Sequence, residues 1–169
     1  MSMARFLVVL LVGGTLLAGV GAWYLTVYAY YDRLPAQDTV LLTPLGAAAA
    51  QDHPVTDFEG IDSDSSPIRY RACFTLDADP AQFTPYPDAA PLIAPNWFDC
   101  FDAHAIGAAL EEGRATAILG QGHLEYGIDR VVAVFPDGRA FAWHQINPCG
   151  EAHFDGDPLP PGCPPPPDR

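Results

Sequence analysis

The chain has 169 residues and a formal net charge of −13 at pH 7. Twenty of its 21 acidic residues but only six of its eight arginines follow Arg33. A surface of this sign argues against nucleic acid and anionic lipid surfaces as partners, and it is suited to attract a basic periplasmic protein such as a small electron carrier. The same acidity also helps to keep an exported domain soluble.

A single apolar run from Phe6 to Tyr31 contains no charged residue. About 20 such residues are enough to cross a bilayer as a helix, so we expect one transmembrane helix over residues 6–31. Arg5 precedes the run, and the two residues after it carry opposite charges. The positive-inside rule therefore places a tail of residues 1–5 in the cytoplasm. The rest of the chain is then periplasmic, anchored in the lipid bilayer of the bacterial inner membrane.

Small residues in this run allow two further interpretations. Val20-Gly21-Ala22 satisfies the cleavage rule of a signal peptide, but the apolar sequence continues beyond it, which favours a retained anchor. Gly14, Ala18 and Ala22 are spaced by four and lie on one face of the expected helix. Such a face lets a second membrane helix approach closely, so we interpret it as a helix-docking face. The alternative is that Gly and Ala are simply common in membrane helices.

The segment after the helix is rich in proline and alanine and has little apolar periodicity. We therefore expect residues 32–56 to form a stalk that separates the folded part from the membrane. One exported domain is expected over residues 57–163, which is long enough for one modest core. A short proline-rich tail, residues 164–169, follows it.

The domain shows strand patterns around one short helix. Residues 128–135 and 139–146 flank the turn Pro136-Asp137-Gly138 and predict a β-hairpin. Asp102 is suited to cap a helix over residues 103–112. Two more strands are predicted, over residues 68–76 and 115–119. The expected fold class is therefore α+β, with mainly antiparallel strands.

All four cysteines lie in the part expected to be exported: Cys73, Cys100, Cys149 and Cys163. An oxidising compartment predicts two disulfides, and four cysteines allow three pairings. We favour Cys73–Cys100 with Cys149–Cys163, because the second pair closes a short loop at the proline-rich end. A metal site is the alternative, since Cys149 and His153 are four apart and His144 is near in sequence. The absence of any C-x-x-C spacing disfavours metal, redox and haem sites, so we predict no cofactor.

The sequence contains no complete catalytic motif. It has no G-x-S-x-G elbow, no P-loop and no H-E-x-x-H, and we predict that the protein is not an enzyme. Its aromatic, histidine and carboxylate residues near the C-terminal end form the most suggestive ligand cluster. The members of this predicted cluster are Trp143, His144, Glu151 and His153. Ordinary core packing or hydrogen bonding is the alternative role for each of them.

Three blocks resemble a small family of uncharacterised bacterial membrane-anchored proteins. They are GIDSDSSPIRYRACF (60–74), WFDCFDAHAIGAALEEG (97–113) and YGIDRVVAVFPDGRAFAWHQINPCGE (126–151). Some members of that family carry the automatic label "histidine kinase". We reject this activity, because a short cytoplasmic tail leaves no room for an ATP-binding domain inside the cell. The resemblance implies the anchored topology and supplies no catalytic residues.

Two function classes follow from these observations. The first is a non-catalytic accessory or assembly subunit of a larger membrane complex, for example a respiratory one, which docks through its helix and its acidic domain. The second is a membrane-tethered domain that binds or senses a small ligand or a metal. The first is the preferred interpretation, because of the small-residue helix face, the expected stalk and the absence of a recognisable active site.

Overall fold

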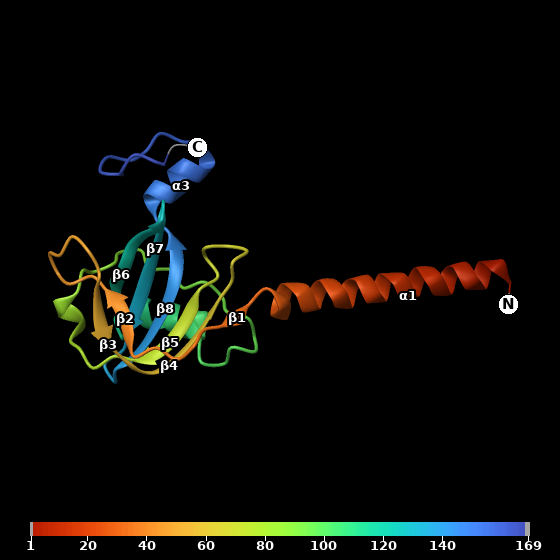
Figure 1. The fold of residues 1–169 in the computed structure, drawn as a ribbon, viewed down its shortest axis with the longest axis horizontal. Helices are drawn as coiled ribbons and strands as arrows, with labels where there is room; N and C mark the ends of the chain where they lie inside the picture. Colours follow the sequence, from red (N-terminus) through yellow and green to blue (C-terminus); the bar gives the residue numbers. More distant parts are fainter. Residues whose placement is uncertain (1, 168–169) are drawn as a thin grey trace.

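The N-terminal apolar run folds as one helix. A computed structural model describes residues 2–167 of the chain. In it, α1 (Met3–Tyr24) continues directly into a π-helical turn, η1 (Leu25–Ala29). The combined helix reaches a mean hydropathy of 2.2 and is not buried against the rest of the protein. It is therefore long and apolar enough to cross a membrane. Figure 1 shows it projecting from one side of the folded part.

The folded part is built on a six-stranded antiparallel sheet. Its strand order is β1-β4-β5-β8-β7-β6. The strands are β1 (Asp32–Arg33), β4 (Thr56–Asp62), β5 (Arg71–Thr75), β6 (Thr116–Glu125), β7 (Ile128–Val134) and β8 (Arg139–Ile146). A separate hairpin of β2 (Thr39–Leu42) and β3 (Gln51–Pro54) lies against β6, where the Thr43 amide donates to the Leu119 carbonyl. The predicted α+β fold with mainly antiparallel strands is confirmed.

The sheet carries a hydrophobic core on each face. Alternate residues of a strand point to opposite faces, and β8 divides in this way. Ala140 and Ala142 pack with the residues of β2, whereas Phe141 and Trp143 pack with those of α2 (Ala103–Glu111). Both faces are covered, and residues 131–134 of β7 and 140–143 of β8 are continuous apolar runs. One turn of 3-10 helix, η2 (Pro80–Gln82), directly precedes the buried Phe83.

The predicted stalk is wrong. Residues 32–56 contain β1, β2 and β3, and β1 pairs with β4 at the edge of the large sheet. Val40 and Leu42 are buried in the core beside β6. The folded domain therefore begins directly after the helix instead of near residue 57. Prolines and alanines in the connecting loops hid these short strands, whose pairing depends on distant residues.

The C-terminal end forms a helix that was not predicted, α3 (Pro148–Asp155). The Asn147 side chain caps it by accepting from the Gly150 amide, and Gly156 ends it in the left-handed conformation. Figure 1 shows α3 and the tail that follows it, up to residue 167, standing off the end of the sheet. The disulfide Cys149–Cys163 ties that tail to α3, and Cys73–Cys100 ties β5 to the loop before α2. This is the pairing favoured from the sequence.

Candidate functional site

Two polar side chains on neighbouring strands contact each other inside the domain. Arg130 on β7 and His144 on β8 are directly opposite each other in the sheet register. The Arg130 Nε–H group donates to His144 Nε2 at 3.2 Å. His144 is buried, and its Nδ1 lies 2.7 Å from the Pro67 carbonyl oxygen. A carbonyl only accepts, so the ring carries its proton on Nδ1 and is neutral.

A stack of planar groups holds this pair in place. The Tyr70 ring lies 4.5 Å from the His144 ring and almost parallel to it, at 15°. The Arg130 guanidinium lies over the same Tyr70 ring at 4.3 Å. Burial and the nearby Arg130 charge lower the pKa of His144 from 6.5 to about 4. Both ring nitrogens already have partners, so His144 has no free position to act as a general base.

This pair lines a hollow of about 420 Å³ between the loop after β4 and the β6–β7 turn. Asp62, Asp64 and Glu125 bring carboxylates to it, together with Ser63 and Ser66. Asp62 Oδ1 accepts a hydrogen bond from the Ser63 amide. Burial nevertheless raises the pKa of the Asp62 carboxyl above its usual 3.8. The hollow therefore combines one cation with several carboxylates.

The hydrogen bonds of Arg130 contrast with those of Arg71. Arg71 is buried and donates to four backbone carbonyls, of Ile68, Tyr70, Leu92 and Ile93. Among residues 2–167, Arg130 donates only through Nε, and its guanidinium forms no ion pair within 4 Å. Its two terminal amino groups have no hydrogen-bond partner there, and they are not buried. They are therefore open to solvent or to a ligand.

A second feature lies where the helix meets the domain. Trp97 Nε1 donates to the Val27 carbonyl at 2.7 Å. Val27 lies in the last turn of the helix, where carbonyls lack intrahelical partners. The Trp97 ring also stacks with Tyr28, at 6.1 Å between centroids, and the Arg33 guanidinium lies 5.2 Å from it. We call Val27, Tyr28, Arg33 and Trp97 the helix junction; it fixes the domain against the end of the helix.

Arg69 extends this contact on the neighbouring loop. Its guanidinium lies 5.5 Å from the Tyr30 ring and 5.4 Å from the Tyr31 ring. Tyrosines of this kind concentrate at membrane interfaces, where their rings meet the headgroups. Arg33 and Arg69 thus lie at the end of the domain nearest the helix.

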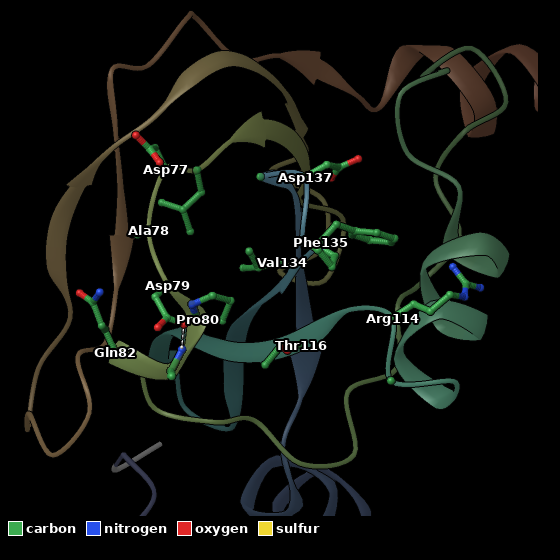
Figure 2. A pocket seen from close by; sticks show the side chains of 15 residues that line it. Asp77, Ala78, Asp79, Pro80, Gln82, Arg114, Thr116, Val134, Phe135 and Asp137 are labelled. Atoms are coloured by element: carbon green, nitrogen blue, oxygen red, sulfur yellow. Dashed lines mark hydrogen bonds between the residues drawn. The ribbon is translucent and has the colours of Figure 1, made fainter.

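A second hollow, of about 880 Å³, is a weaker candidate. It lies between η2 and the β7–β8 turn, and Figure 2 shows the side chains that line it. Three of its four charged groups have partners within the domain: Asp137 binds Arg139, Arg114 binds Glu112, and Asp79 caps η2. The fourth, the Asp77 carboxylate, forms no hydrogen bond or ion pair with residues 2–167. A ligand would find few free donors or acceptors there.

The comparisons with known proteins place the chain in a family. A family model described as "Family of unknown function (DUF6446)" matches residues 40–164, well over half of the chain. The chain belongs to the DUF6446 family. The matched range runs from β2 to just beyond Cys163 and leaves α1 outside. No curated protein and no solved structure matches the chain.

The structure separates the predicted ligand cluster of this DUF6446 protein. Trp143 is fully buried in the core on the α2 face, while the His144 ring stacks on Tyr70 at the other face. Glu151 and His153 lie on α3, where His153 contacts Tyr126. Within residues 2–167, no hydrogen bond or ring contact joins these two to Trp143 or His144, and no group of three metal-binding side chains occurs there.

Arg130 is the residue that sequence reasoning missed in this DUF6446 chain. The predicted hairpin contained the signal needed to find it, because a turn centred on Asp137 places Arg130 opposite His144. Tyr70 stacks on His144 and Asp62 lines the hollow because β4, β5 and β8 pair with one another, which no local pattern reveals.

Proposed function

We propose that the protein is a non-catalytic accessory or assembly subunit of a larger bacterial membrane complex, for example a respiratory one. Its helix crosses the inner membrane with residues 1–5 in the cytoplasm, and its acidic domain lies in the periplasm. The helix docks against integral-membrane partners, and the domain contacts their exported surfaces or a basic periplasmic protein. The helix junction is the observation that carries this proposal.

The junction matters because it restricts the movement of the domain relative to the helix, which a flexible stalk would allow. The Trp97–Val27 hydrogen bond and the rings around it couple the position of the domain to the helix. A partner that binds the helix therefore also sets where the domain stands above the membrane. The face formed by Gly14, Ala18 and Ala22 is exposed along α1 and offers the close approach that such a partner needs.

Gentle purification tests this proposal. The full-length chain, with a C-terminal tag, is extracted from its own membranes in several mild detergents, and copurifying proteins are quantified by mass spectrometry. We expect integral-membrane proteins in fixed proportion to the chain. Recovery of the chain alone in every detergent would contradict the proposal.

A second candidate function is a membrane-tethered domain that binds a small ligand. One observation favours it. The Arg130 guanidinium is held by Tyr70 and His144, yet its terminal amino groups face no partner within residues 2–167. Preorganised donors of this kind are typical of small-molecule sites.

A further inference from the structure

The hollow beside Arg130 has the chemistry of a site for a ligand with two opposite charges. We propose that it binds a small zwitterion of the α-amino acid class, whose carboxylate meets Arg130 and whose ammonium meets Asp62 and its neighbouring carboxylates. This inference rests on the second candidate function and is independent of the accessory role.

The Arg130 guanidinium is suited to bind the carboxylate of the ligand. A guanidinium presents paired N–H groups that match the two oxygens of a carboxylate. Stacking on Tyr70 and the bond from Nε to His144 fix the plane of this guanidinium before any ligand arrives. A preorganised fork loses little conformational entropy on binding, so it is a favourable anchor. Neutral His144 adds no second positive charge.

The carboxylates that line the hollow are suited to bind the ammonium group of the ligand. Asp62, Asp64 and Glu125 bring three carboxylates against the single charge of Arg130. An anion without a cationic group would meet net repulsion there, and a cation without a carboxylate would leave the Arg130 fork unused. A molecule that carries both groups satisfies both ends. The volume of about 420 Å³ lies within the range of small-molecule sites.

The apolar wall allows for a side chain on this ligand. Ile128, Leu124 and Pro67 line the same hollow. A ligand in the hollow would therefore have its charged groups on the polar residues and its hydrocarbon part against these three. We expect amino acids with an apolar side chain to bind more tightly than glycine, because they bury more apolar surface.

The test uses the purified full-length chain in detergent and a panel of free α-amino acids. Binding is followed by isothermal titration and by the melting temperature. At a concentration about 100-fold above Kd, a ligand raises the melting temperature by roughly 5–10 °C. The same amino acids with an acetylated amine or an amidated carboxylate are the matched probes, and each is expected to bind at least about tenfold more weakly.

Two variants localise the site. Arg130→Lys keeps the positive charge but removes the fork, and Asp62→Asn removes one carboxylate at the far end. Both are expected to weaken binding about tenfold or more, whereas Arg114→Gln, at an exposed arginine outside the hollow, leaves it unchanged. A flat response to every free amino acid would overturn the proposal, and so would unchanged affinity in both site variants. Partners that still copurify in that case would leave the accessory role standing.

Discussion

At the scale of single residues, His144 is a buried base that folding keeps neutral. Burial and Arg130 lower its pKa from 6.5 to about 4. Between these two values the unfolded chain binds a proton at this ring and the folded chain does not. The free energy of unfolding therefore falls as the pH is lowered from about 6.5 to about 4, by at most about 3 kcal/mol from this residue.

The variant His144→Gln tests this account, because it removes the titrating group. We expect the wild-type protein to lose stability more steeply than the variant between pH 6.5 and pH 4. Chemical denaturation at several pH values measures both. The raised pKa of Asp62 acts in the opposite sense and is present in both proteins, so the difference between them isolates His144. Parallel pH profiles would contradict the account.

At the scale of secondary-structure elements, α3 is held to the sheet by the contact of two glycines. A Cβ atom on Gly127 would overlap the Cα atom of Gly150, and Gly127 has a positive φ of +77°. Asn147 adds hydrogen bonds on the same side, since its Nδ2 donates to the buried Asp129 carboxylate at 2.9 Å. The first turn of α3 thus packs directly against the turn between β6 and β7.

Gly127→Ala is therefore expected to separate α3 from the sheet. Gly156→Ala is the matched control, because Gly156 has a similar φ of +78° with no atom within 4 Å of the added Cβ. We expect the control to cost about 1 kcal/mol of stability and Gly127→Ala to cost clearly more. Thermal unfolding gives the stabilities, and hydrogen exchange of residues 148–155 shows whether α3 loosens. Equal losses in the two variants would contradict the account.

The elements predicted from the sequence are those defined by local patterns. The hairpin of β7 and β8 and helix α2 with its Asp102 cap follow from alternation, a glycine turn and capping chemistry. Strand β1 is only Asp32–Arg33 and exists because β4 lies beside it, which no local pattern reveals. Helix α3 has few apolar residues, but Asn147 before Pro148 and Gly156 after Asp155 were usable signals of its ends.

The candidate site could be predicted only in part for a similar reason. The sequence singled out His144, and the hairpin register implied its neighbour Arg130. Trp143 was grouped with His144 although adjacent strand residues point to opposite faces, so strand geometry alone argued against that pairing. Asp62 reaches the hollow from β4, two strands away from β8.

At the scale of the whole molecule, the helix junction decides how helix and domain move relative to each other. Trp97→Phe keeps an aromatic ring at the junction but loses the donor to the Val27 carbonyl, and Trp97→Ala loses both. We expect the alanine variant to lower the free energy of local opening at the junction by about 1–2 kcal/mol. This corresponds to roughly 5–30-fold faster hydrogen exchange at residues 28–34. The exchange rate of the phenylalanine variant is expected to lie between those of the alanine variant and the wild type. An unchanged rate in the alanine variant would contradict a fixed junction.

Docking of the helix against partners in the membrane is tested by comparing two substitutions in α1. Ala18→Leu adds bulk to the small-residue face, while Leu17→Ala changes a neighbouring position and leaves that face intact. The measurement is the amount of each copurifying membrane protein per tagged chain. The account predicts that Ala18→Leu loses partners that the wild type and Leu17→Ala retain. Equal recovery from all three chains would contradict docking through this face.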